Sequence, residues 1–163
     1  MRGGRRLGID VGSVRVGVAT CDLQALLAHP LTTLATNEEG GDVAEIARLA
    51  GELDVIEIIL GLPRSLDGSE GPAAVRARRY ARTVAGACPT VSVRLVDERL
   101  TTVDAHRNLR ASGISERAHR PVIDQAAAVL ILQAALDAER ATGAPPGLPA
   151  SGKRRKPRTK GTT

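Results

Sequence analysis

The segment from residues 7 to 19 constrains the fold more than any other part of the sequence. It reads Leu-Gly-Ile-Asp-Val-Gly-Ser-Val-Arg-Val-Gly-Val-Ala, an apolar run interrupted by glycines and by one acidic residue, Asp10. This pattern predicts two strands, over 5–12 and 14–21, joined by a hairpin turn at Gly12 and Ser13. Because side chains alternate across a sheet, Gly8, Asp10 and Gly12 share one face, and Asp10 has free space around it.

The rest of the chain alternates short apolar runs with amphipathic stretches. The predicted elements are strands over 31–36, 55–61 and 91–96, and helices over 42–53, 72–87, 102–113 and 121–141. Asp42 is a candidate N-cap of the first helix. A hairpin followed by strand–helix units predicts an α/β fold with a mixed sheet and helices on both faces. The length of 163 residues suits a single domain.

The positive charge of the chain is concentrated at its end. Residues 143–163 contain six of the 23 lysines and arginines and no acidic residue, so the remainder is nearly neutral. A stretch rich in Pro and Gly opens this segment, and such a composition cannot build a core. We therefore expect a folded domain over 1–142 and a disordered basic tail over 143–163. The tail would attract phosphates or act only as a solubilising extension.

Cysteine usage and hydropathy predict a cytoplasmic protein. Cys21 and Cys88 lie far apart, without a Cys-x-x-Cys pair, so neither a zinc site nor a redox motif is indicated. The basic N-terminus leads into a strand rather than into the apolar region of a signal peptide. No apolar run approaches the length that spans a bilayer, so no membrane association is expected.

Three acidic positions have the character of functional carboxylates. Asp10 interrupts an apolar strand, where an ionised group needs a cation or hydrogen-bond donors nearby. Asp97 and Glu98 end the strand over 91–96, and alternation favours Glu98 as the one that faces Asp10, with Asp97 in reserve. Asp124 is placed in the first turns of the last helix, where the helix dipole favours an anion, beside a stripe of small residues that allows close approach to a sheet.

Carboxylates without histidine or cysteine are hard oxygen ligands, and they suit Mg²⁺ or Mn²⁺ better than zinc. Two such ions about 4 Å apart can bind a scissile phosphate between them. If Asp10, Glu98 and Asp124 meet, the expected reaction is phosphodiester hydrolysis.

Several polar and basic side chains are candidates for binding nucleic acid. The loop over 61–71 leaves the carboxyl end of a strand, where α/β sheets tend to bind ligands. The candidates are Arg15, Arg64, Ser65, Ser69, Arg99 and Thr101. Tyr80 is the only aromatic residue besides histidine, and base-specific reading of single strands usually depends on aromatic stacking. We therefore expect recognition of structure more than of sequence.

Four motifs in order resemble the YqgF family of bacterial Holliday-junction resolvases, also described as pre-16S rRNA nucleases. They are the segment over 7–19, Gly61-Leu-Pro-Arg with Asp67-Gly-Ser-Glu-Gly, Val96-Asp-Glu-Arg-Leu-Thr-Thr, and Val122-Ile-Asp-Gln-Ala-Ala-Ala-Val-Leu-Ile-Leu-Gln. The resemblance implies a ribonuclease H-like fold, with a five-stranded mixed sheet whose second strand is antiparallel. It also implies a metal-dependent site at Asp10, Glu98 and Asp124. Arg64 and Val11 depart from the family pattern.

Three classes of function are compatible with the sequence. The leading one is a metal-dependent endonuclease acting either on four-way junction DNA, which predicts a homodimer because two symmetric cuts are needed, or on precursor rRNA, which allows a monomer. The second is a phosphotransferase of the sugar-kinase and actin type, which would need a second lobe for which the chain has no room. The third is a non-catalytic nucleic-acid-binding module with the same fold.

Overall fold

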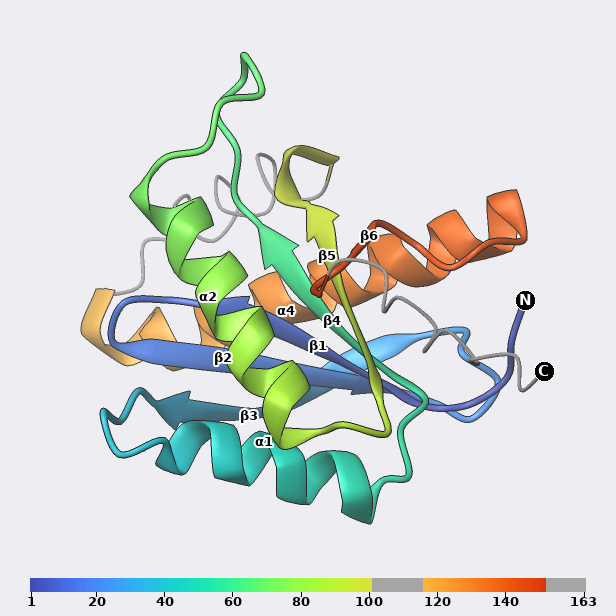
Figure 1. Ribbon diagram of the computed structural model, residues 1–163, viewed down its shortest axis with the longest axis horizontal. Coiled ribbons are helices and arrows are strands. Elements are labelled where there is room, and N and C mark those ends of the chain that lie inside the picture. The colour runs from blue at the N-terminus through green and yellow to red at the C-terminus, as the bar shows by residue number, and fades with distance from the viewer. Residues whose placement is uncertain (101–115, 152–163) are drawn as a thin grey trace, which may run out of the picture.

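The computed structural model describes residues 1–100 and 116–151, and for Leu100 and 116–123 it describes the backbone only. Its helices lie on both faces of one sheet, with α1 and α2 on one side and α4 on the other (Figure 1). The strands are β1 (Arg6–Val11), β2 (Arg15–Cys21), β3 (Ala28–Ala35), β4 (Glu57–Leu62), β5 (Ser92–Asp97) and β6 (Leu148–Pro149). The helices are α1 (Gly41–Glu52), α2 (Pro72–Ala87), the 3₁₀ turn η1 (Glu98–Leu100) and α4 (Glu116–Thr142).

The sheet is mixed, as predicted. Its strand order is β3-β2-β1-β4-β5-β6. Strand β2 runs antiparallel to β1 and β3, whereas β1, β4 and β5 run parallel to one another. The hairpin between β1 and β2 is closed by the Gly12 amide, which donates to the carbonyl of Arg15 at 2.9 Å. The parallel strands therefore direct their carboxyl ends, near Asp10, Leu62 and Asp97, to the same end of the sheet.

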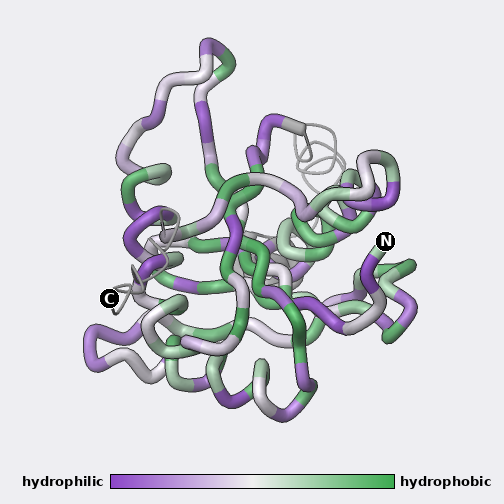
Figure 2. Tube along the Cα trace, turned by 45° about the vertical axis from the view of Figure 1, so that its right-hand side comes forward, coloured by the Kyte–Doolittle hydropathy of each residue, from purple (hydrophilic) through white to green (hydrophobic). Residues whose placement is uncertain are grey.

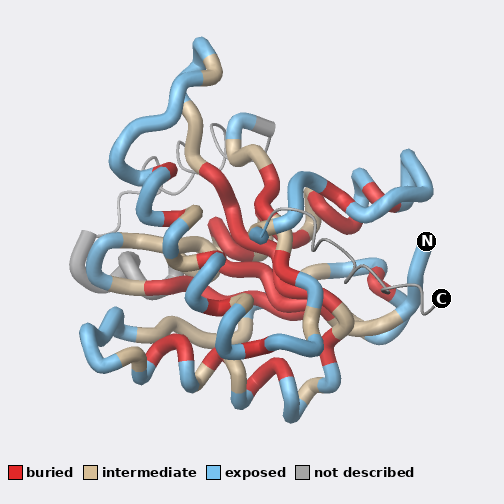
Figure 3. Tube along the Cα trace, in the orientation of Figure 1, coloured by how far each residue is buried: buried red, intermediate tan, exposed pale blue. Residues whose placement is uncertain are grey.

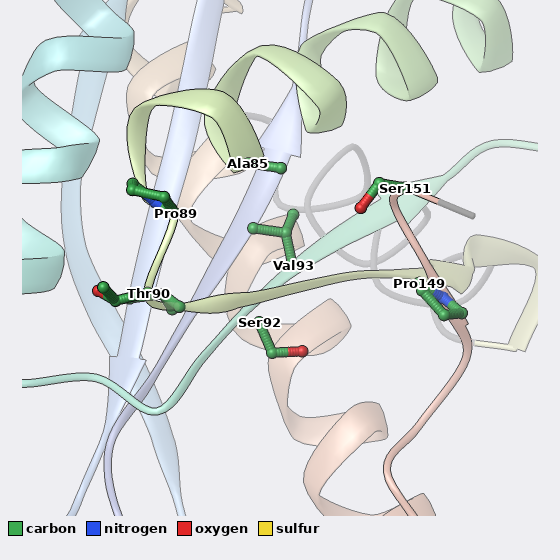
Figure 4. A pocket seen from close by; sticks show the side chains of 8 residues that line it. Ala85, Pro89, Thr90, Ser92, Val93, Pro149 and Ser151 are labelled. Carbon is green, nitrogen blue, oxygen red and sulfur yellow. The ribbon is translucent and has the colours of Figure 1, made fainter. Parts of the chain in front are cut away.

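The sheet has six strands instead of the expected five, because part of the predicted tail folds. Leu148 and Pro149 pair with Leu95 and Arg94, and the Arg94 side chain donates to the carbonyls of Pro146 and Gly147. Figure 4 shows Pro149 and Ser151 across a pocket from Ser92 and Val93. Pairing with β6 covers the edge of β5, which would otherwise be an exposed sheet edge. The expected boundary at residue 142 thus differs from the structure, and 152–163 lie outside the described residues.

The core is aliphatic and is divided by the sheet into two layers. On the α1–α2 side it contains Leu7, Ile9, Ile58 and Leu60, and on the α4 side it is built from small residues and a few larger ones, such as Ile131. Figure 3 shows the buried central strands, and the hydropathic colouring in Figure 2 follows the same pattern. A side chain at Gly8 would approach the Ala128 carbonyl to 2.8 Å. Glycine in β1 therefore lets α4 lie directly on the sheet.

An ion network anchors α4 at the end of the sheet remote from the carboxyl ends of the parallel strands. The Arg6 guanidinium, 1% exposed, contacts the Glu139 carboxylate at 3.1 Å, and Arg2 bridges Glu139 and Glu57. These contacts hold the pKa of Glu139 down at about 2. Breaking a buried pair leaves an uncompensated charge, so the network resists displacement of α4.

Several predicted boundaries differ from the structure. Gly40, not Asp42, is the N-cap of α1, and α4 begins at Glu116, so Pro121 lies within it rather than at its start. Strand β3 begins at Ala28 and includes Pro30, which an edge strand tolerates. The helix predicted over 102–113 lies outside the described residues. Among the described helices, none combines the length and apolar character needed to cross a bilayer.

Candidate active site

Asp10 lies between two glycines on the neighbouring strands. Asp10 pairs with Gly17 on β2. On β4, Leu60 pairs with Ile9, so the next residue, Gly61, lies beside Asp10. A methyl group on Gly17 would overlap the backbone carbonyl of Asp124, and one on Gly61 would overlap the Glu98 carboxylate. The absence of side chains at these two positions therefore allows Asp124 and Glu98 to approach Asp10 from either side.

The structure separates the roles of Asp97 and Glu98. Glu98 opens η1 and faces α4, beside Gly61 and Ile131. Asp97 engages Arg99, whose Nη2 lies 2.7 Å from Asp97 Oδ2, and this bonding lowers the Asp97 pKa. Of the two, Glu98 is the residue whose charge acts on Asp10.

Asp124 lies on α4 at the same end of the sheet. Its Oδ2 is 3.5 Å from Arg15 Nε, and the Asp124 side chain is 24% exposed. Both residues line a hollow of about 250 Å³ beside the tip of the β1–β2 hairpin. Because α4 begins eight residues earlier, Asp124 is not in the first turn, and the helix dipole, whose effect falls off within one turn, contributes little to its stability as an anion.

Glu98 and Asp124 both act electrostatically on Asp10. Burial and, to a smaller extent, the charges of Glu98 and Asp124 together raise the pKa of Asp10 to about 7. Burial also raises the pKa of Glu98, with Asp97 adding to the effect. Like charges held together with little solvent destabilise the ionised state. Such clusters are typical of sites that bind a cation or move a proton.

The predicted nucleic-acid contacts fall into two groups beside these carboxylates. Arg64 and Arg99 both contact Asp97, and Arg64 also contacts Glu70 at 3.7 Å. Its buried Nε atom donates no hydrogen bond to any described residue. These two guanidiniums form a cationic rim next to Glu98, whereas Arg15 lies on the opposite side with Asp124.

The loop over 63–71 projects from the carboxyl end of β4 (Figure 1). It contains Ser65 and Ser69, which stabilise its own turn: the Ser65 amide donates to the Ser69 carbonyl and the Ser69 amide donates to Asp67. Both serines are exposed. Their backbone amides are therefore engaged within the loop, and the Ser69 side chain is also hydrogen-bonded to Asp67, which lowers the pKa of that carboxyl. Thr101 lies outside the described residues.

Comparison with known proteins identifies the family. The family model described as "RuvX: Holliday junction resolvase" matches residues 4–138. The chain belongs to the RuvX family. A protein from Kineococcus radiotolerans described as "Putative pre-16S rRNA nuclease" is 56% identical over 99% of this chain and 87% of its own length. A Streptomyces coelicolor protein of the same description is 51% identical over 90% of this chain and 88% of its own.

Solved structures agree with the expected fold. Thermus thermophilus RuvC in complex with a Holliday junction substrate superposes with a TM-score of 0.57 at 16% identity, over 90% of this chain and 99% of that one. Another Thermus thermophilus RuvC structure gives a TM-score of 0.55. The ribonuclease H-like fold is thus confirmed. As a RuvX member, the chain is a nuclease that acts on structured nucleic acid.

The donor chemistry of the RuvX site suits a hard divalent cation. Asp10, Glu98 and Asp124 offer only carboxylate oxygens, which Mg²⁺ and Mn²⁺ prefer, and the raised Asp10 pKa reflects its burial together with the charges of the other two. The described side chains do not, however, form a closed cluster of three or more acidic, histidine or cysteine ligands. Arg15 supplies part of the charge compensation at Asp124.

The sequence pattern placed Gly8 and Gly12 beside Asp10, but it assigned Gly61 only to the end of a strand and the start of the following loop, and it gave Gly17 no role. Both lie inside strands, where a glycine often marks a close approach of another backbone or of a ligand, and that signal is visible in the sequence. Their importance becomes apparent only from the strand register, which places them on either side of Asp10.

Gly61→Ala is expected to lower the cleavage rate by about tenfold or more, because the added methyl group would displace the Glu98 carboxylate. The effect should appear in single-turnover rates on any substrate the protein cleaves. Gly51→Ala is the matched control, since an added methyl group there meets nothing within 4 Å and should leave the rate unchanged. Equal rates for the two variants would contradict the inferred crowding at Gly61.

Proposed function

We propose that this RuvX protein is a divalent-metal-dependent endonuclease in which Asp10, Glu98 and Asp124 hold Mg²⁺ or Mn²⁺. The supporting observation is that Glu98, from η1, and Asp124, from α4, lie close enough to Asp10 on β1 for their charges to add to burial in raising the pKa of Asp10 to about 7. A site built to receive cations has this electrostatic character before they bind. The match of residues 4–138 to a family described as a Holliday junction resolvase favours the nuclease over the phosphotransferase alternative.

The proposed chemistry is hydrolysis of a phosphodiester bond by a two-metal-ion mechanism. Bound divalent ions supply an activated water and stabilise the leaving 3′ oxygen. Asp10, held rigidly in β1, would fix the position of this chemistry on the sheet. Arg64 and Arg99 would hold the nucleic-acid backbone, with Asp97 setting the orientation of both guanidiniums.

Arg15, the hydroxyls of Ser65 and Ser69, and Thr101 complete the proposed nucleic-acid contacts. The basic segment over 152–163 would add affinity that depends on salt concentration. We place the folded domain over 1–151 rather than 1–142, because β6 belongs to the sheet. Both candidate substrates are found in the bacterial cytoplasm, and the free, buried Cys21 and Cys88 are compatible with that reducing compartment.

Two substrates are supported by different comparisons. The proteins from Kineococcus and Streptomyces are described as acting on pre-16S rRNA, and their high identity makes this our first candidate. The family description favours the second, a Holliday junction. Symmetric resolution of a junction needs two active sites, so that substrate requires a homodimer, whereas trimming an rRNA precursor requires only one chain.

The test is a side-by-side cleavage assay on precursor 16S rRNA and on four-way junction DNA, with Mg²⁺, with Mn²⁺ and with EDTA. We expect metal-dependent cleavage of the rRNA precursor and none of a linear duplex of equal length. Light scattering on the same samples should show a monomer. Symmetric junction cleavage by a dimer would instead establish the second substrate, and cleavage that persists in EDTA would refute metal dependence.

A further inference from the structure

A second pocket lies across the sheet from the carboxylates, on the side covered by α1 and α2. It has a volume of about 370 Å³ and is bordered by the hairpin residues Gly12 and Ser13, by Asn37, and by Asp42, Arg76 and Tyr80 from the two helices. Ligand pockets in proteins are typically about 300–1,000 Å³. This one is therefore at the small end, with room for one planar group.

Asp42 is the chemically unusual member of the pocket. It is 6% exposed, and its Oδ2 accepts a hydrogen bond of 2.7 Å from the Tyr80 hydroxyl. Burial and the Asp42 charge raise the Tyr80 pKa, so this hydroxyl keeps its proton and remains the donor. Asp42 Oδ1 is buried and accepts no hydrogen bond from any described residue. A buried carboxylate oxygen without a donor is costly.

The charges around the pocket indicate what it would accept. Among the residues that line the pocket, Asp42 and Glu38 are acidic and Arg76 alone is basic. This balance disfavours a phosphate and favours an uncharged group that donates hydrogen bonds. Tyr80, the only tyrosine of a chain without Phe or Trp, lies in the same wall. A ring beside a hydrogen-bond acceptor is a common arrangement for an unstacked base.

The pocket is also close to the candidate active site along the chain. Gly12 and Ser13 line both this pocket and the hollow that contains Arg15 and Asp124. The hairpin tip therefore separates the pocket from this hollow. Val11, which lines the pocket, is the residue directly after Asp10. A strand crossing the hairpin tip would place one nucleotide on each side of it.

We propose that the Asp42–Tyr80 pocket binds one unstacked base of the substrate, with Asp42 Oδ1 accepting a hydrogen bond from an exocyclic amino group. The inference rests on the proposed function only in taking the substrate to be nucleic acid. Cytosine, adenine and guanine carry such an amino group. Uracil and thymine do not, and their ring N–H is flanked by two carbonyl oxygens that a carboxylate repels. The pocket thus gives the protein a preference among bases beside its recognition of structure.

The test measures binding without cleavage, in the Asp10→Asn background, using labelled octamers of cytidine and of uridine. We expect the cytidine octamer to bind about tenfold more tightly, as one discriminating hydrogen bond allows. Adding Asp42→Asn should abolish the preference, because the amide still accepts from Tyr80 but presents an amino group where Oδ1 was. Asp54→Asn, on an exposed residue just after α1, is the control and should keep the preference.

A second measurement keeps the proposal testable if Asp42→Asn fails to fold. The NMR signals of the sole tyrosine ring should shift when the cytidine octamer binds the Asp10→Asn protein. An unmoved Tyr80 signal, equal affinity for the two octamers, or a preference that survives in Asp42→Asn would each overturn the inference. Because no cleavage is required, failure of the nuclease assay would leave this result interpretable.

Discussion

Asp10→Asn is expected to reduce the rate of metal-dependent cleavage by about a thousandfold or more, equivalent to roughly 4 kcal/mol of transition-state stabilisation. Asparagine has nearly the same shape, so the packing between Gly17 and Gly61 should be preserved. It removes the charge that lies between Glu98 and Asp124, and with it the proposed capacity to hold divalent ions. Single-turnover rates at saturating Mg²⁺ measure the effect.

Nucleic-acid affinity should change much less in the same variant, because Arg64, Arg99 and Arg15 are untouched. Asp137→Asn, an exposed carboxylate on α4 with a side chain 59% exposed, is the matched control and should retain the full rate. An Asp10→Asn protein that cleaves at the normal rate would rule out Asp10 as a metal ligand.

The same substitution is expected to stabilise the metal-free protein at alkaline pH. The Asp10 pKa rises from an ordinary 3.8 to about 7 in the folded state, so between these values the folded state binds more protons than the unfolded state. The free energy of unfolding therefore decreases as pH rises through this window and levels off above pH 7. A shift of this size corresponds to about 4 kcal/mol.

Thermal unfolding in EDTA at pH 5 and at pH 8 tests this linkage. For a chain of this size, the pH-dependent loss attributable to Asp10 corresponds to roughly 10 °C in melting temperature. Asp10→Asn should largely lack that component, and Mg²⁺ at pH 8 should raise the melting temperature of the parent protein but hardly that of the variant. Identical pH profiles of the parent and the variant would show that Asp10 is not destabilised by its neighbours.

Much of the fold follows from local patterns in the sequence. Alternation along residues 7–19 predicted the hairpin and placed Asp10 on the face opposite Ile9, and Pro72 marked the start of α2 where the structure has it. These predictions succeed because side-chain alternation and helix starts depend on neighbouring residues alone. The expected five strands became six because pairing of Leu148 with Leu95 is a contact between distant segments, and composition does not report such contacts.

The sequence by itself determined which carboxylates are chemically unusual. An ionised side chain between Ile9 and Val11, or beside the Ala127–Ala128 stripe, carries a desolvation cost in any fold that buries these apolar neighbours. Only the tertiary structure decided that Glu98 and Asp124 lie on either side of Asp10, through the register that sets Gly17 and Gly61 beside it. It likewise decided that Asp42 faces Tyr80 instead of capping α1. The physical reason is that burial and electrostatic coupling depend on distances in space, which the register and the packing of α4 establish.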